Sequence, residues 1–270
     1  MLAGVSSFMM LPMQDEGGFH GPTIEDFFPP AILYEGTAFE FNRIMMVRLI
    51  AAISLVVFFL WATNRMKLVP SRKQSLAELG IVAVRDNIAI EVLGKEKGTR
   101  YATLLTFIFW AILAMNITGV IPFLNIAGSS VVGMPAVMAI IATVGFIVAG
   151  VKEQGGWHFV KGALFPPGVP WPIYLILTPI EFISTFVLRP ITLTIRLLAN
   201  MMSGHFLLVL CFAGTNFLFM EASLALKPVG VLTLAAGVAF TLFELFIAVL
   251  QAYIFTLLTT VYIQLATESH

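Results

Sequence analysis

The chain has 270 residues, of which 59% are hydrophobic and only 11% are charged, and its formal net charge is zero. Soluble domains carry about a quarter charged residues, so this composition is typical of a membrane protein. A single cysteine, Cys211, excludes a disulfide within the chain. No basic tract or P-loop pattern is present, so we expect neither nucleic acid nor ATP as a direct ligand. We also expect no cofactor and no metal site.

Residues 1–43 are expected to lie on the non-cytoplasmic side of the membrane. Positions 14–40 contain six acidic residues and no lysine or arginine. The apolar start of the chain lacks the basic region and the cleavage site of a signal peptide. We therefore interpret this segment as exposed and outside the membrane.

The first transmembrane helix is predicted at 44–63, with Arg43 and Arg48 at its start. Long basic side chains at such a position are expected to reach the membrane interface. Residues 64–100 follow and carry eight basic residues, which places this loop in the cytoplasm by the positive-inside rule. Apolar residues near helical spacing within the loop predict an amphipathic helix on the membrane surface.

A transmembrane hairpin is predicted at 101–151. Its two apolar spans, about 101–123 and 131–151, are joined by a link without charged residues. The next loop, 152–170, contains two lysines and is expected to return to the cytoplasm.

The last two apolar runs, 171–220 and 229–266, are too long for upright spans. Even the shorter run would form a helix ~57 Å long, whereas the hydrocarbon core is ~30 Å thick. We therefore expect 171–266 to form a hairpin of two long, strongly tilted helices. The predicted fold is an all-α polytopic membrane protein with about five transmembrane helices and a cytoplasmic carboxyl terminus. The alternative is six spans, with a break near Arg189-Pro190.

Arg196 lies in the middle of the first long run. An arginine at membrane depth costs ~2.5–3.5 kcal/mol on insertion scales, so it indicates a functional site. Arg189 and Ser203 are seven residues away on either side and share its helix face to within ~20°. Asn200 is four residues after Arg196 and lies on the same side of the helix. Taken alone, Arg189 could equally reach a membrane interface.

The last run has a polar stripe of its own. Glu244, Gln251 and Tyr262 align because steps of seven and eleven both nearly complete whole turns. A lone carboxylate in such an apolar helix needs a partner or a proton. His205 alone would be an ordinary packing histidine, and Gln251 alone an ordinary hydrogen-bonding residue between helices. The functional interpretation rests on their occurrence together in adjacent helices.

Three motifs resemble those of a known family. They are Arg196-Leu-Leu-Ala-Asn200-Met-Met-Ser-Gly-His205, preceded by Arg189-Pro190; Glu244-Leu-Phe-Ile-Ala-Val-Leu-Gln251-Ala-Tyr-Ile-Phe, running on to Tyr262; and Asn116-Ile-Thr-Gly-Val-Ile-Pro122. From about residue 20 to its end, the chain resembles subunit a of the F-type ATP synthase membrane sector.

The resemblance implies that Arg196 is the essential arginine that faces a ring of c subunits, each carrying one carboxylate. Two aqueous half-channels then reach that carboxylate from opposite sides without meeting. A fixed positive charge between them favours the deprotonated carboxylate and repels a proton that would cross directly. The chain itself would have no catalytic site.

The resemblance also implies a proton pathway and a set of partners. His205 and Glu244 match two positions where an acid and a histidine often occur, here with their roles exchanged, and we place them on the outer side. Expected partners are the c-ring, peripheral-stalk b-type subunits, the lipid bilayer and, indirectly, the soluble ATPase head, in a bacterial plasma membrane. The candidate pathway residues are Asn116, Asn200, Ser203, His205, Glu244, Gln251 and Tyr262, with Arg189 and Glu181 as secondary candidates.

Two other classes of membrane protein fit the sequence less well. A secondary transporter would show internal repeats with interrupted helices, and none is apparent. A haem subunit would need paired histidines, but only His205 falls in a predicted membrane helix. Proton and sodium both stay open as the transported ion, because its ligands would lie largely on the ring.

Overall fold

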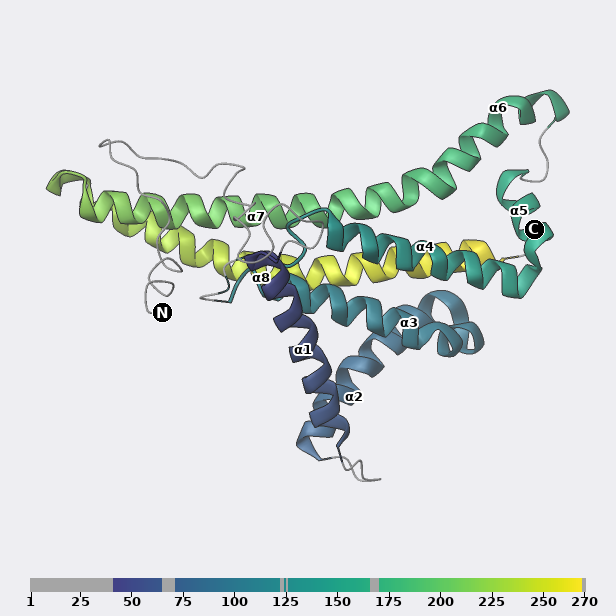
Figure 1. Cartoon of the computed structure of the whole chain (residues 1–270), viewed down its shortest axis with the longest axis horizontal. Coiled ribbons are helices and arrows are strands. Elements are labelled where there is room, and N and C mark those ends of the chain that lie inside the picture. Colours follow the sequence, from purple (N-terminus) through teal and green to yellow (C-terminus); the bar gives the residue numbers. More distant parts are fainter. Residues whose placement is uncertain (1–40, 65–70, 122–123, 125, 166–169, 269–270) are drawn as a thin grey trace.

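The computed structural model describes residues 41–64, 71–121, 124, 126–165 and 170–268, and within these ranges it consists of helices without a β-sheet (Figure 1). Five helices in this part of the chain are long and apolar enough to cross a membrane, which confirms five spans rather than six. Most of the segment 1–43 lies outside the described residues. In chain order the elements are α1 (Arg43–Thr63), α2 (Arg72–Val84), the π-helix η3 (Arg85–Ile90), α3 (Glu91–Ile117), α4 (Gly133–Gln154), α5 (Gly156–Leu164), α6 (Trp171–Phe182), the π-helix η4 (Ile183–Leu188), α7 (Arg189–Met220), the 3₁₀ turn η5 (Leu224–Leu226) and α8 (Lys227–Thr267).

A long helical arm precedes the second span. The segment in which we predicted a surface helix contains α2, which continues through η3 to a sharp reversal at Gly94. This residue has φ +77°, a conformation that favours glycine. After the reversal α3 packs tightly on η3, since a Cβ at Gly98 would lie 2.7 Å from the carbonyl oxygen of Ala89. The helix that carries the second predicted span therefore starts before residue 101, directly after the turn, and where it enters the membrane stays a prediction.

Helix α1 is tied to the link between α3 and α4. The Arg48 guanidinium donates to the carbonyl oxygens of Gly128 at 2.8 Å and Val131 at 3.2 Å, and Arg43 donates to that of Leu124 at 3.0 Å. These contacts tie both arginines to the α3–α4 link, and their position at the membrane interface stays a prediction. The carbonyls of the link lack helical partners, and a partly buried guanidinium satisfies them with charge-assisted hydrogen bonds.

Replacing Arg48 with alanine is expected to destabilise the protein. Hydrogen bonds from a charged group contribute ~1.5–3 kcal/mol each, so losing both should cost about 3 kcal/mol or more and lower the melting temperature by roughly 6 °C or more. Thermal unfolding of the purified complex in detergent measures this change. Arg100→Ala is the matched control, because its ion pair with Glu153 is largely exposed and contributes little. Equal melting temperatures for the two variants would contradict the role of Arg48.

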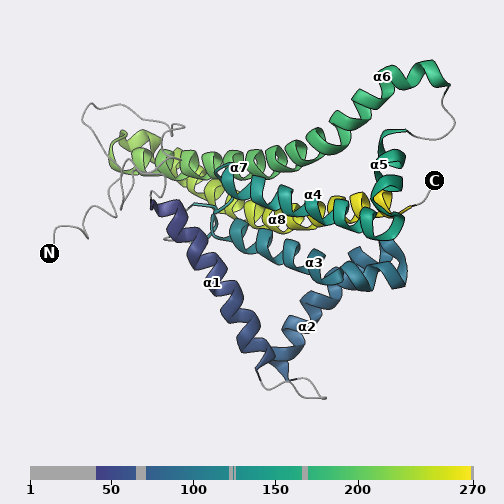
Figure 2. The same ribbon diagram turned by 45° about the vertical axis from the view of Figure 1, so that its right-hand side comes forward.

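Helices α6, η4 and α7 form one long bent helix, and α8 runs back along it (Figures 1 and 2). Contacts between the two occur in reverse order along the chain, which makes the packing antiparallel. They join Arg189 with Tyr262, Asn200 with Gln251, and Thr215 with Thr233. The end of α7 and the start of α8 extend beyond α3 and α4 in both views. The tilt of this pair in a bilayer stays a prediction.

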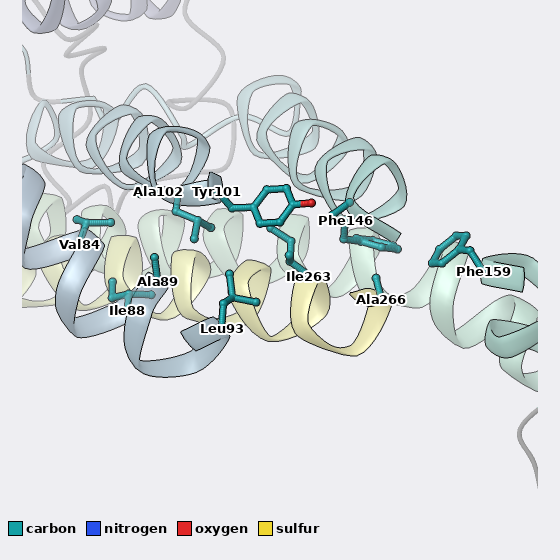
Figure 3. Close-up of a cluster of buried hydrophobic side chains, with 12 residues drawn as sticks. Val84, Ile88, Ala89, Leu93, Tyr101, Ala102, Phe146, Phe159, Ile263 and Ala266 are labelled. Carbon is teal, nitrogen blue, oxygen red and sulfur yellow. The ribbon is translucent and has the colours of Figure 1, made fainter. Parts of the chain in front are cut away.

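Two clusters of buried apolar side chains hold the helices together. One lies where η3, α3, α4, α5 and α8 meet, and its large members include Tyr101, Phe146 and Phe159 (Figure 3). The other packs against one side of the first half of α7 and includes Leu193 and Leu197. The second cluster fixes which side of α7 faces the protein, and hence which side faces outward.

Candidate functional site

Arg196 lies on the outward side of α7. The nearby side chains of Leu193 and Leu197, turned toward the other helices, are each only 1% exposed and pack in the core. Arg196 and the adjacent Ile195 are exposed. Within the described residues, the Arg196 guanidinium makes no hydrogen bond or ion pair. A guanidinium in an apolar membrane environment is costly without a counter-charge, so an exposed arginine on this apolar helix favours an anionic partner other than the described residues.

One helical turn after Arg196, the polar stripes of the two long helices meet. Asn200 Nδ2 donates to Gln251 Oε1 at 2.7 Å. Gln251 is 2% exposed, and its Nε2 has no hydrogen-bond partner among the described residues. The pair therefore leaves a buried amide donor free for water or for a passing group. Ser203 is exposed and donates to the carbonyl oxygen of Asn200 at 3.2 Å.

Glu244 of α8 is buried against a glycine of α7. Glu244 is only 3% exposed, and neither of its carboxyl oxygens has a hydrogen-bond partner in the described part of the chain. A Cβ on Gly204 would lie 3.2 Å from Glu244 Oε1, so the absence of a side chain there makes room for the carboxyl group. A buried carboxyl without a fixed partner holds its proton or takes water.

His205 follows Gly204 directly and is partly buried. The structure thus places His205 next to the glycine that contacts the Glu244 carboxyl group, without a direct hydrogen bond between the two side chains. The functional coupling of His205 and Glu244 stays a prediction.

A cavity of about 1250 Å³ lined by both charged and apolar side chains, the polar cavity, lies at the other end of the α7–α8 pair, between α4, α5, α6 and the end of α8. Glu181 and Arg189, the two secondary candidates, both line it. Charged side chains that we did not single out from the sequence also contribute, and the only signal for them was their place near helix ends. They are Lys97, Glu153, Lys161 and Glu268.

Tyr262 and Asn116 lie in different surroundings. Tyr262 packs its ring against the Arg189 guanidinium, with 4.9 Å between the guanidinium carbon and the ring centroid. Asn116 is fully buried near the end of α3, where its Oδ1 accepts from Ser129 Oγ at 2.6 Å. Asn116 thus supports the α3–α4 link, and its place in a proton pathway stays a prediction.

Known proteins resemble the chain over nearly its whole length. A family model described as the ATP synthase A chain matches residues 44–264, a range that includes all the candidate residues. Over 93% of its length the chain is 47% identical to ATP synthase subunit a of Rhodococcus erythropolis, covering 91% of that protein. Identity is 40% to the Pseudarthrobacter chlorophenolicus subunit a, over 97% of this chain and 99% of the relative. It is 35% to that of Streptomyces lividans, over 95% and 90%.

Proposed function

The chain belongs to the ATP synthase A chain family, a multi-span subunit of the ATP synthase membrane sector, and from this premise we propose that it forms two offset half-channels that pass protons to and from the carboxylates of a c-ring. The observation that carries the proposal is the outward-facing Arg196, which has no counter-charge in the described chain. A carboxylate on a rotating neighbour supplies that charge.

Arg196 acts in this proposal as a fixed cation between the two paths. Opposite unit charges 4 Å apart attract by ~4 kcal/mol at an effective dielectric constant of 20. This attraction favours loss of the proton from a ring carboxylate as it arrives. Arginine suits the role because it stays protonated even when it is desolvated. Its charge also repels a proton that would pass straight from one path to the other.

The two polar regions lie on opposite sides of Arg196 along α7. Gly204 and His205, with Glu244 opposite, follow it in the chain, whereas Glu181 and Arg189 precede it and line the polar cavity. We assign the first region to the outer path and the cavity to the inner path. A proton that crosses the whole field contributes ~2.3 kcal/mol per 100 mV, and it crosses only when the ring turns.

The proposed setting follows from this role. The subunit would contact the c-ring through the outward side of α7 and peripheral-stalk b-type subunits elsewhere, and would connect indirectly to the soluble ATPase head. It would span a bacterial plasma membrane with its amino terminus outside and its carboxyl terminus in the cytoplasm. Protons are the proposed ion, and ATP chemistry takes place on other subunits.

Cysteine cross-linking tests the proposed ring face. In a Cys211→Ala background, Ala199→Cys places a thiol on the exposed side of α7, one turn from Arg196. We expect it to form a disulfide with a cysteine introduced beside the ring carboxylate. Val144→Cys is the control and should not cross-link. Val144 lies on the exposed side of α4, where the native valine is 52% exposed. The reverse pattern would exclude this side of α7 as the ring face.

A further inference from the structure

Arg189 is held by an aromatic ring instead of a carboxylate. Its guanidinium carbon lies 4.9 Å from the centroid of the Tyr262 ring, and that ring packs edge-on against Phe146 at 6.2 Å. Helices α7, α8 and α4 therefore meet at this stack. The ion pairs within the described residues join other arginines, Arg85 and Arg100. A cation–π contact fixes the guanidinium while leaving its net charge intact, whereas a carboxylate partner would cancel that charge.

The stack stands at the wall of the polar cavity. Arg189 lines this cavity together with Glu181 and Thr185, and the π-helix η4 lies between Glu181 and Arg189. Residues after a π-helical segment point to a different side of the helix than a regular α-helix would give them. Such segments occur often at functional sites. Arg189 is seven residues before Arg196, or ~10 Å along the helix. It therefore lies between the cavity and the arginine of the proposed ring face.

We propose that Arg189, held against the Tyr262 ring, is a positioning residue for proton release, a second fixed positive charge that favours the deprotonated ring carboxylate at the inner path. This inference rests on the proposed function above. No ion pair of the described residues cancels this charge, so its field acts on a ring carboxylate at the inner path, against the opposing charges of Glu153, Glu181 and Glu268 in the same cavity. Arg196 then receives a carboxylate that is already ionised. Tyr262 holds the guanidinium at the cavity wall.

Passive proton flow through the membrane sector, freed of the ATPase head and driven by a potassium diffusion potential, tests this role. The measured quantity is the cytoplasmic-side pH at which inward flow is half maximal, with the opposite pH held constant. Arg189→Gln removes the charge, so release becomes harder, and the midpoint should move to higher pH by about half a unit. Arg189→Lys keeps the charge and should move it by less.

Variants of the ring separate the charge from its support. Tyr262→Phe keeps the aromatic face, so the midpoint should stay at its native pH, whatever the loss of the hydroxyl does to the rate of flow. Tyr262→Leu removes the face, so the guanidinium is no longer held, and the midpoint should move in the same direction as in Arg189→Gln. A role in packing alone would lower the amount of assembled complex in these variants without moving the midpoint.

The outcomes are distinct from those that bear on the proposed function. An unchanged midpoint in assembled Arg189→Gln overturns the inference, even if Arg196→Ala is inactive. If Arg189→Gln does not assemble, equal midpoints for Tyr262→Phe and Tyr262→Leu overturn it instead. Normal coupling in an Arg196→Ala complex overturns the proposed function itself, whatever the Arg189 variants show.

Discussion

Replacement of Arg196 by alanine is expected to abolish both ATP synthesis driven by a proton gradient and proton pumping driven by ATP, with a fall of at least ~100-fold. The guanidinium is exposed and makes no hydrogen bond in the described chain, so its truncation leaves no cavity and the complex should still assemble. The variant lacks the positive charge that attracts the ring carboxylate, and this attraction amounts to several kcal/mol at contact. Synthesis and pumping in membrane vesicles, normalised to the amount of assembled complex, measure the effect.

Two further variants define the cause of that loss. Arg196→Lys should rescue coupling poorly, because an ammonium is compact, strongly hydrated and able to lose its proton when buried. Ile195→Ala changes the adjacent exposed position and should retain coupling. Passive proton leak should rise in Arg196→Ala, since nothing then separates the two paths. An Arg196→Ala complex that synthesises ATP at the normal rate would exclude the role assigned to this residue.

The pairing of the two long helices could be predicted from the polar residues alone. In lipid, an amide side chain finds partners only on other helices. Asn200 and Gln251 were therefore each expected to form a hydrogen bond with another helix, and the observed hydrogen bond joins the two residues directly. The helical repeat placed Arg196 on the same side as Asn200. Family motifs then indicated which of these residues carries the charge that the ring meets.

Other features depend on contacts between distant parts of the chain. The π-helix at Ile183–Leu188 itself contains no proline or glycine. Pro190, two residues after it, indicates a bend in the helix but not the extra residue in the π-helical turns. Arg48 reaches carbonyl oxygens about 80 residues away in the chain, and a sequence does not show whether such a side chain turns to water or inward. Gly94 did offer a signal, because a glycine between charged helical segments is a common point of reversal.

Glu244→Gln is expected to slow proton-driven ATP synthesis by about tenfold or more while leaving assembly intact. Glutamine has nearly the same shape, so it should fit the space beside Gly204 that the carboxyl group occupies. It has no proton to exchange, and a lost proton-transfer group costs ~10²–10⁴-fold when it is essential. The fall is expected to lie below this range, because water that enters beside a buried group without a fixed partner can carry part of the flow.

A double-mutant cycle with His205→Ala decides whether the two residues serve one path. If both act in series on the same proton, removing the second after the first should cost little, and the double variant should be about as slow as the slower single variant. Thr118→Val provides the comparison, because Thr118 Oγ1 donates to the Met115 carbonyl oxygen at 2.7 Å and accepts from Gly128 N at 3.1 Å near the α3–α4 link, and its effect should multiply with that of Glu244→Gln. Fully multiplicative effects for His205 and Glu244 would show that they act independently, and the outer path would then need a different route past Gly204.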